Sequence, residues 1–256
     1  MKQHYFKVII ITISILLLLT SCGRTSYQYN NLTSGEDIKE FIDIMVSAEV
    51  PDKDIEAVLE YIETYSDSEY SENAIINGWQ QTTKDYQELY DYTDAINAYT
   101  SKEFEDINCR QAAFIIYHSF FCASEPENQN LQRESLELPE FLNEELYNYE
   151  ILFSRIPMGE TVADTVLNFW RDNGAVFEKA SVHLVSIWGN SDGEVLNYHA
   201  GIMIEEEAGI VFFEKTDPIM PFQLSRFASL DELKAHLLSR DGIDGTPIIF
   251  LDDTLI

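Results

Sequence analysis

Basic residues are scarce in this 256-residue sequence: 16 lysines and arginines stand against 45 aspartates and glutamates, and the formal net charge is −29. A surface this acidic repels nucleic acid and anionic lipid headgroups, so both are excluded as partners of the folded part. The acids are spread along the chain and not gathered in one tail. This favours a role in solubility over a preference for cationic partners or divalent cations.

Cysteine is also rare, with only Cys22, Cys109 and Cys122. The stretch between the last two, RQAAFIIYHSFF, has a helical pattern. As a helix it would hold Cys109 and Cys122 about 20 Å apart, whereas a disulfide requires Cα atoms within roughly 7 Å. The sequence therefore predicts that Cys109 is a free thiol. Cys122, which follows two phenylalanines, is expected to be a buried structural residue.

Motifs for metals and cofactors are missing. The sequence contains no glycine-rich phosphate loop and no HExxH zinc motif. The aspartates at positions 192, 217, 252 and 253 lack the spacing of a calcium loop, and DGIDG at 241–245 is typical of a turn. No metal and no cofactor is therefore predicted.

The amino terminus has the pattern of an export signal. Lys2 and Lys7 accompany an apolar run over 8–19, which as a helix is about 18 Å long. That is too short to cross a roughly 30 Å hydrocarbon core comfortably. The next residues, LTSCG at 19–23, resemble the bacterial lipobox. This resemblance implies cleavage before Cys22, a diacylglyceryl group on its sulfur, and a lipid-anchored protein on the extracytoplasmic side of the cell membrane. The alternative is an uncleaved membrane anchor with an incidental cysteine.

The expected organisation is a signal peptide over 1–21, a lipidated cysteine with a polar tether over 22–33, and a single α+β domain over 34–256. Within this domain, 34–100 is expected to be helical and 101–256 to form a papain-like core. Removing the signal takes away two lysines and no acids, so the net charge of the mature chain becomes about −31.

Hydrophobic periodicity separates the expected helices from the expected strands. Helices are predicted over 36–48, 51–66, 82–99, 108–121, 139–149, 160–172 and 229–238, and strands over 180–188, 195–204, 209–215, 222–227 and 246–251. Helices in the first half followed by an antiparallel sheet indicate the α+β class.

A candidate nucleophile stands at the start of the helix predicted over 108–121. Asn108 is a favourable N-cap, and Gln111 completes a variant of the capping box, so Cys109 falls in the first turn. There its sulfur would face unpaired N–H groups and the positive end of the helix dipole. These groups and the neighbouring Arg110 favour the thiolate. The Cys109 N–H and the Asn108 side chain could hold a developing oxyanion.

A nucleophilic cysteine needs a base, and histidine is the first choice. His4 leaves with the signal, and His118 is predicted on the opposite face of the cysteine's helix, nine residues away. His236 belongs to an amphipathic helix and is expected on the surface. His183 and His199, both on predicted strands, remain.

His199 has the better surroundings, because the small residues 200–201 leave room for a substrate or another side chain. If the chain reverses between positions 206 and 207, Glu214 faces His199 on the next strand, with Cβ atoms about 5 Å apart. Glu214 could then orient the imidazole, as the third member of a catalytic triad does. A slip of one residue would bring Lys215 opposite instead.

This order of elements resembles the papain-like and NlpC-type cysteine peptidases and amidases, in which a cysteine at a helix start precedes a histidine and a polar residue on successive strands. The resemblance implies that Cys109 attacks an amide carbonyl, His199 moves the proton and Glu214 orients the histidine. NlpC-type enzymes usually have Asp-Cys-Ser or Asp-Cys-Gly where this chain has Asn-Cys-Arg. The expected substrates are peptide or amide bonds in wall material or extracellular peptides, and a monomer is expected.

A second resemblance covers nearly the whole mature chain. The segments YNNL, NCR, HAGI, FFEK and PFQLSRF resemble a family of lipoproteins from Gram-positive bacteria catalogued only as a domain of unknown function (number 4300). Two alternatives to a hydrolase remain open. The protein could be a non-catalytic surface lipoprotein that binds a wall component or protein partner, with the arrangement of Cys109 and His199 vestigial or coincidental. It could also be a papain-like scaffold that acts as an inhibitor or chaperone.

Overall fold

The computed structural model describes residues 26–76, 78–84, 86–90, 106–124, 140–240 and 246–256. The signal predicted over 1–21, the lipidation site Cys22 and most of the helix predicted over 82–99 lie outside these residues. Within 82–99 the structure describes the short helix α4 (Tyr86–Leu89).

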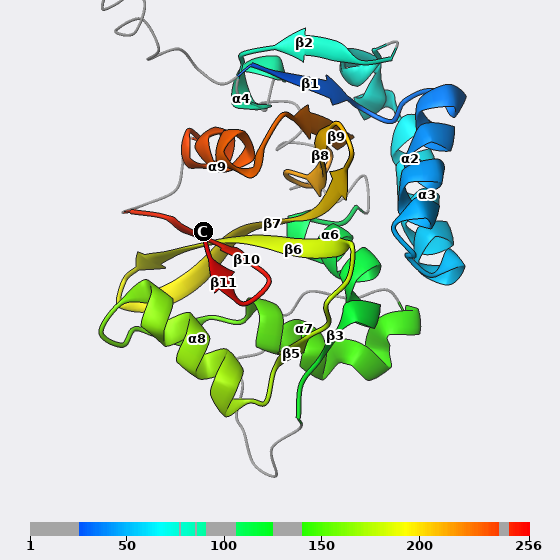
Figure 1. The fold of residues 1–256 in the computed structure, drawn as a ribbon. Coiled ribbons are helices and arrows are strands. Elements are labelled where there is room, and N and C mark those ends of the chain that lie inside the picture. Colours follow the sequence, from blue (N-terminus) through cyan, green and yellow to red (C-terminus); the bar gives the residue numbers. More distant parts are fainter. Residues whose placement is uncertain (1–25, 77, 85, 91–105, 125–139, 241–245) are drawn as a thin grey trace, which may run out of the picture.

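An antiparallel sheet forms the centre of the molecule (Figure 1). Its strands are β1 (Tyr27–Asn30), β2 (Gln80–Thr82), β4 (Ile156–Pro157), β6 (Val182–Ser191), β7 (Glu194–Glu206), β8 (Gly209–Lys215), β9 (Phe222–Phe227), β10 (Ile248–Leu251) and β11 (Thr254–Leu255). The strands β6 to β9 follow one another in the chain and lie side by side. The order across the sheet is β11-β10-β6-β7-β8-β9-β1-β2, and β4 pairs with the start of β7.

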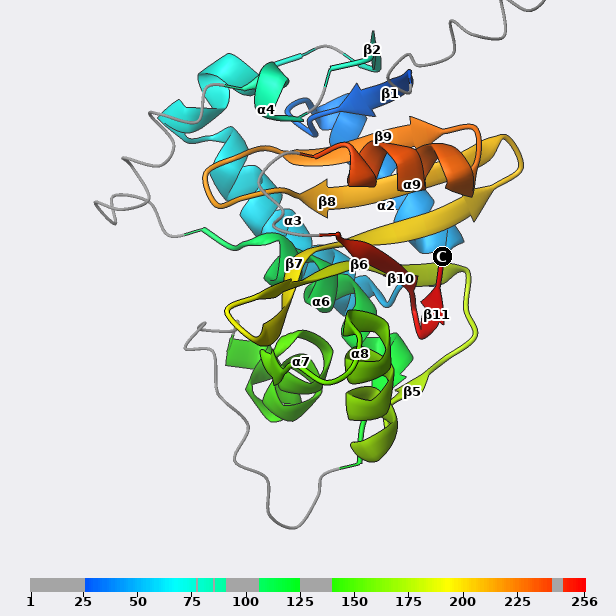
Figure 2. The ribbon, with the colours of Figure 1, turned by 90° about the vertical axis from the view of Figure 1, so that its left-hand side faces the viewer.

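Helices cover the two faces of the sheet unequally (Figures 1 and 2). The main helices are α2 (Gly35–Ser47), α3 (Asp52–Ser66), α6 (Cys109–Tyr117), α7 (Leu146–Phe153), α8 (Val162–Asp172) and α9 (Leu230–Leu238). All but α9 share one core cluster with Leu184 and Ile202 of the sheet, whereas α9 packs with Ile187 and Met203 on the other face. Both faces of the central strands are therefore buried, which explains the nearly continuous apolar runs of β6 to β8.

The α+β class predicted from the sequence is confirmed, and β8 and β9 have the predicted bounds. The strand β7 continues to Glu206, beyond its predicted end, and β6 and β7 extend further toward each other than predicted, because their turn shrinks to Asp192 and Gly193. These two residues have φ values of 52° and 82°, as a tight hairpin turn requires. The helix predicted over 139–149 begins as a 3₁₀ helix (Glu140–Glu145) and continues as α7.

The prediction of a polar tether over 22–33 is wrong from Tyr27 onward, because β1 belongs to the sheet. This strand pairs with β9 on one side and β2 on the other. Tyr27 and Leu32 are 2% and 0% exposed, and the Tyr27 ring stacks on Phe227. A strand held by a partner almost two hundred residues away has little local signal, so its polar sequence suggested a linker.

The helix predicted over 108–121 also ends early, at Tyr117. A 3₁₀ turn (His118–Phe120) follows, and then β3 (Phe121–Cys122) pairs with β5 (Val176–Phe177). The prediction that Cys122 is buried is wrong: Phe121 points into the core, and Cys122, the next strand residue, is exposed. Cys109 and Cys122 are both free thiols.

The small residue Gly201 on β7 leaves room for another side chain. A Cβ atom at Gly201 would lie 2.3 Å from Cζ of Phe212 and 2.9 Å from the carbonyl oxygen of Phe213. The space that the sequence suggested beside His199 is therefore occupied at this position by the Phe212 ring.

Gly201→Ala is expected to lower the free energy of unfolding by about 1–3 kcal/mol, because the ring and backbone must shift to admit a methyl group. Urea denaturation measures this change. Gly35→Ala, at the start of α2, is the matched control, since a methyl group added there would meet no atom within 4 Å. An equal response of the two variants would contradict the packing argument.

Candidate active site

A capping box closes the start of α6. Asn108 Oδ1 accepts a hydrogen bond from the Gln111 N–H at 3.1 Å, and Gln111 Oε1 accepts one from the Asn108 N–H at 2.9 Å. The predicted cap is confirmed, and it makes Cys109 the first residue of the helix. The Cys109 N–H takes no part in the box and has no acceptor within the helix. Since Asn108 Oδ1 is engaged as the cap, Nδ2 is the donor that this side chain could offer to an oxyanion.

An interruption in the pairing of β7 lies beside Cys109. On the side of β7 away from β6, β4 pairs with Glu194 and Val195, and β8 pairs from Ile202 onward. Between them, positions 196–201 have no strand on this side in the described part of the chain. The start of α6 meets β7 there, and the Ala200 N–H donates a hydrogen bond to the Cys109 sulfur.

A β-bulge lies directly before His199. Ile187 pairs with His199 but Trp188 pairs with Asn197, so Tyr198 is an additional residue in β7. Bulges redirect side chains and are frequent beside functional sites. The residue that follows this bulge is His199, whose ring contacts the Cys109 sulfur.

His199 also contacts Glu214. Its Nε2 lies 2.7 Å from Glu214 Oε2, and the two side chains are 7% and 0% exposed. The ring N–H is not aligned with this oxygen, so the contact is an ion pair and not a linear hydrogen bond. With Nε2 against Glu214, Nδ1 is the ring nitrogen that remains for the thiol. The structure thus brings Cys109, His199 and Glu214 together in the predicted order.

The charges of these groups support one another. Burial alone would raise the pKa of the Cys109 thiol, but His199, Arg110 and the Ala200 N–H together lower it. Burial alone would lower the pKa of His199, but Cys109 and Glu214 outweigh burial and raise it to about 9. Both shifts favour a thiolate–imidazolium pair over a neutral thiol and imidazole.

The register predicted between β7 and β8 is wrong. The chain reverses after Glu207, with Glu206 paired to Gly209 and Ile202 to Phe213, so Glu214 is not directly opposite His199. The true register is displaced by two residues from the predicted one. A shift of two keeps every side chain on its face of the sheet. Glu214 is therefore a diagonal neighbour of His199, and its long side chain covers the distance.

Arg240 is a member of this cluster that the sequence did not indicate. Its guanidinium donates two hydrogen bonds to Glu214, at 2.7 Å to Oε2 and 2.6 Å to Oε1, and its side chain is only 7% exposed. Burial alone would raise the pKa of the Glu214 carboxyl, but Arg240 and His199 hold it well below its usual range. Arg240 follows the end of α9, where a cation is common near any helix C-terminus. No local pattern therefore distinguishes it.

His236 lies behind Arg240, and the prediction that it is a surface residue is wrong. It is 4% exposed and packs against the rings of Tyr27 and Phe227. Its Nε2 lies 3.2 Å from Arg240 Nη2. Burial and the Arg240 charge lower the pKa of His236 to about 3, so the neutral ring accepts a hydrogen bond from the guanidinium.

A second buried ion pair anchors the segment before Cys109. Lys215 Nζ lies 2.7 Å from Asp106 Oδ2, and the two side chains are 0% and 2% exposed. The ammonium also donates to the Met220 carbonyl at 2.6 Å, and Asp106 accepts the Ile219 N–H. Glu214 and Lys215 are consecutive on β8, so their side chains leave opposite faces of the strand. One end of β8 therefore contacts both the histidine and the segment that leads to the cysteine.

The other two histidines of the described chain have carboxylate partners elsewhere. His118 Nε2 lies 2.9 Å from Asp54, deep in the core. His183 Nδ1 lies 2.7 Å from Asp252 in the turn between β10 and β11, and this partner raises the pKa of His183. Neither histidine belongs to the Cys109 cluster.

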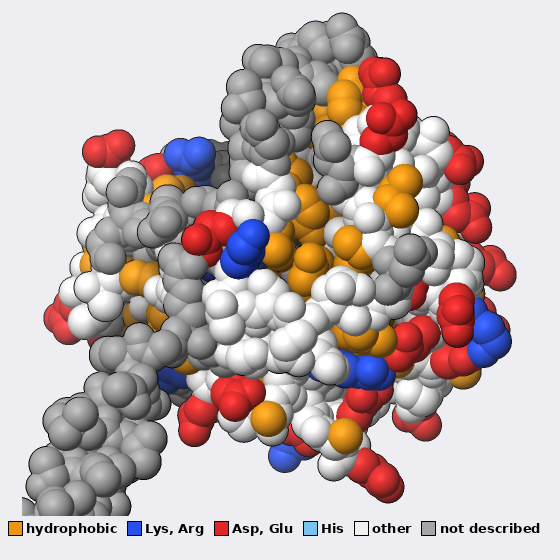
Figure 3. Space-filling model, turned by 90° about the horizontal axis from the view of Figure 1, so that it is seen from above, with side chains coloured by type: hydrophobic (Ala, Val, Ile, Leu, Met, Phe, Trp, Pro, Cys, Tyr) orange, Lys and Arg blue, Asp and Glu red, His pale blue; other side chains and the backbone are white. Residues whose placement is uncertain are grey.

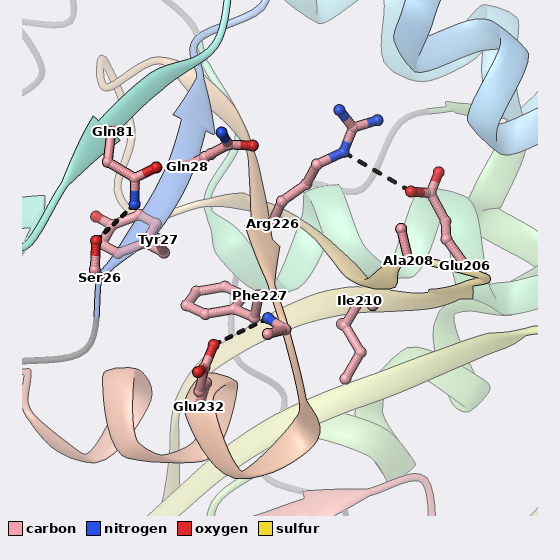
Figure 4. A pocket seen from close by; sticks show the side chains of 12 residues that line it. Ser26, Tyr27, Gln28, Gln81, Glu206, Ala208, Ile210, Arg226, Phe227 and Glu232 are labelled. Atoms are coloured by element: carbon pink, nitrogen blue, oxygen red, sulfur yellow. Dashed lines mark hydrogen bonds and ion pairs between the residues drawn. The ribbon is translucent and has the colours of Figure 1, made fainter.

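A pocket of about 580 Å³ lies away from this cluster (Figure 4). It is lined by Ser26, Tyr27, Gln28, Gln81, Glu206, Ala208, Gly209, Ile210, Arg226, Phe227, Ala228 and Glu232. Figure 4 shows Arg226 directed toward Glu206, and Arg226 also pairs with Glu40 and covers the Trp79 ring. No lining residue belongs to the Cys109 cluster, so the pocket is not part of the candidate active site.

Acidic side chains are distributed around the outline of the molecule seen from above, with few basic side chains between them (Figure 3). In the described ranges, no group of three or more His, Cys, Asp or Glu side chains could hold a metal ion. No helix in the described part of the chain is long and apolar enough to cross a membrane.

Fold and site together define an α+β protein with a cysteine at a helix start, beside a buried histidine–glutamate–arginine cluster. Residues 28–256 match the family described as a domain of unknown function (DUF4300), and the chain belongs to this family. No curated protein and no solved structure gives a significant match to the chain.

Proposed function

We propose that this protein is a lipid-anchored cysteine hydrolase of the cell envelope, with a papain-like arrangement of helix and sheet, that cleaves peptide or amide bonds. The observation that supports the proposal most directly is the contact of the Cys109 sulfur with His199 at the capped start of α6. A cysteine nucleophile needs a neighbouring base and an oriented partner for that base. Glu214 has the position of that partner.

In the first half of the reaction, the Cys109 thiolate attacks the carbonyl carbon and the C=O electron pair moves to oxygen. The Cys109 N–H and Asn108 Nδ2 bind the resulting oxyanion. As the tetrahedral intermediate collapses, the C–N bond breaks and the leaving nitrogen takes a proton from the His199 imidazolium. The products of this half are a free amine and a thioester on Cys109.

In the second half, neutral His199 takes a proton from water as the water oxygen attacks the thioester carbonyl. Collapse of this second intermediate breaks the C–S bond and releases the carboxylic acid product. Cys109 returns to the thiolate and His199 to the imidazolium. Glu214 keeps the ring oriented through both halves, and Arg240 keeps Glu214 ionised.

Peptide hydrolysis tests the proposed activity. Wall-derived peptides and a mixed peptide library are incubated with the protein, and new amino termini are identified by mass spectrometry. We expect cleavage that is lost in Cys109→Ala and retained in Cys122→Ala, because Cys122 is an exposed thiol outside the cluster. Cleavage that persists in Cys109→Ala would contradict the proposal.

The lipid anchor is tested separately. In bacterial cells, Cys22→Ser is expected to move the protein from the membrane fraction to the medium or to leave it as an unprocessed precursor. The mass of the amino-terminal peptide of the wild-type protein would identify the acyl groups. An unmodified Cys22 in a membrane-bound chain would support the uncleaved anchor instead.

A further inference from the structure

Asn197 is a buried side chain whose hydrogen-bonding capacity is unused. The residue is 7% exposed, and neither Oδ1 nor Nδ2 has a hydrogen-bond partner in the described part of the protein. A buried polar group left unpaired costs about 1–3 kcal/mol. Other buried asparagines of this chain are paired: Asn173 Nδ2, for example, donates to the Phe169 carbonyl at 2.7 Å. Asn197 is therefore an exception that requires an explanation.

The strand register shows which face of the sheet Asn197 occupies. It pairs with Trp188 on β6, and cross-strand partners share a face. Trp188 packs against Trp170, in the core cluster to which α6 also contributes. The side chain of Asn197 therefore lies on the face that carries the helix of Cys109.

The direction of α6 places its start toward Asn197. Cys109, the first residue of the helix, contacts the Ala200 N–H. Tyr117, the last residue, contacts the backbone of Leu184 through its hydroxyl group, and Leu184 pairs with Ile202. The helix thus runs from Ala200 toward later residues of β7. Its free N–H groups point the opposite way, toward earlier residues of β7.

Asn197 lies three residues before Ala200, but Tyr198 is the extra residue of the bulge. The partners Trp188 and Ser186 are only two residues apart on β6, so the distance along the strand is about 7 Å. It therefore lies beyond the start of α6, on the side where a substrate held by the Cys109 N–H must extend. The distance corresponds to about two residues of an extended peptide, shortened by the reach of the side chains.

We propose that Asn197 binds a peptide group of the substrate, one or two residues from the bond that Cys109 attacks. Nδ2 donates to a substrate carbonyl oxygen and Oδ1 accepts from a substrate N–H, so the recognised group is an amide. This inference rests on the proposed function and names the class of its substrate: a peptide that continues beyond the cleaved bond, in preference to a small isolated amide.

Two alkylating probes with the same reactive group test this inference. Iodoacetamide ends at its first amide, whereas iodoacetyl-glycinamide carries a second amide one residue further. Reaction at Cys109 is followed by peptide mass spectrometry, and the measured quantity is the ratio of the two rates. We expect the longer probe to react about tenfold faster with the wild-type protein, as hydrogen bonding worth about 1.4 kcal/mol would produce.

Asn197→Leu is expected to bring this ratio close to one and to leave the iodoacetamide rate unchanged. Its unfolding free energy should equal or exceed that of the wild type, because two unpaired polar atoms are removed. Asn197→Ala, with a smaller side chain, is the second variant in case leucine does not fit. Asn173→Leu is the matched control: it loses a formed hydrogen bond, so its stability should fall while the ratio stays high.

A ratio near one in the wild type, or the same high ratio in wild type and Asn197→Leu, would overturn the inference. The ratio can be measured even if Cys109 has an ordinary pKa and reacts slowly with both probes. An ordinary pKa and slow reaction of Cys109 would count against the proposed hydrolase function, while the ratio of the two rates would still decide the role of Asn197.

Discussion

At pH 6, His199→Ala is expected to slow the alkylation of Cys109 by iodoacetamide by about 100-fold, because an ordinary thiol with a pKa near 8.5 is only about 0.3% ionised at that pH. In the wild-type protein the thiolate is favoured by the His199 imidazolium, Arg110 and the Ala200 N–H, which together lower the pKa of the thiol. Removing the imidazolium leaves burial as the largest influence, and burial raises the pKa of Cys109.

The sign of the pH dependence follows from the two shifted groups. The pKa of His199 is raised to about 9, so the imidazolium persists from acidic pH up to about that value and is lost above it. The pKa of Cys109 is lowered, so the thiolate persists to a lower pH than an ordinary thiolate does and is lost on further acidification. The ion pair therefore exists between these limits. Alkylation rates measured from pH 5 to pH 10 should rise at a lower pH in the wild type than in His199→Ala.

His183→Ala is the control for the removal of a histidine from the sheet. His183 pairs with Asp252 at 2.7 Å and makes no contact with Cys109 in the described structure. Its substitution should leave the pH profile of Cys109 unchanged. A wild-type thiol that titrates near 8.5 and does not respond to His199→Ala would contradict the proposed thiolate–imidazolium pair and favour a non-catalytic binding protein.

The start of α6 could be predicted because its signal is local. Asn108 and Gln111 form their capping box within one turn, so the sequence alone determines where the helix begins. The position of Cys109 in the first turn follows directly. The end of the same helix could not be predicted, because the pattern of residues 118–122 fits a helix and a strand equally well. The pairing with β5 decides between the two.

The contact between His199 and Glu214 could be predicted only in part. The alternation of a strand determines which side chains share a face, and His199 and Glu214 share a face in both the predicted and the true register. The distance between them depends on the turn, which reverses one position later than predicted. A displacement by an odd number of residues would have separated them, and nothing in the turn sequence excluded it.

The supporting residues of the site could not be predicted. Arg240 and Asp106 acquire their charged partners from another element, β8, and Asn197 is buried by the packing of the sheet. None of the three has a distinctive neighbour in the sequence. His236 was expected on the surface because its helix is amphipathic. Its face is instead covered by β1, a strand that the sequence did not indicate.

Asp106→Ala is expected to lower the free energy of unfolding by about 3–5 kcal/mol, because it leaves the Lys215 ammonium buried without its counter-charge. Lys215 is 0% exposed and lies between the rings of Tyr65 and Phe222, so water cannot replace the carboxylate. Burial already lowers the pKa of Lys215 even with Asp106 present. Urea denaturation at pH 7 measures the loss.

The double variant Asp106→Ala with Lys215→Met is expected to recover most of this stability, because an apolar side chain replaces the unpaired charge. The Ile219 N–H, which Asp106 accepts, still loses its partner, so recovery is incomplete. A loss in Asp106→Ala that Lys215→Met does not relieve would mean that the backbone contact with Ile219, and not the ion pair, holds this segment.

Reactivity of Cys109 in the stabilised double variant separates two roles of the pair. Asp106 lies three residues before Cys109, and Lys215 follows Glu214 on β8, so the pair joins the cysteine's segment to the strand that holds the histidine's partner. If the double variant regains its stability but Cys109 is alkylated more slowly at pH 6 than in the wild type, the pair fixes the position of the sulfur relative to the imidazole. If the stability and the alkylation rate of the double variant both equal those of the wild type, the pair only stabilises the fold and the capping box alone positions Cys109. We expect the first result, because the two hydrogen bonds of the capping box are local to the start of α6, whereas the ion pair reaches β8.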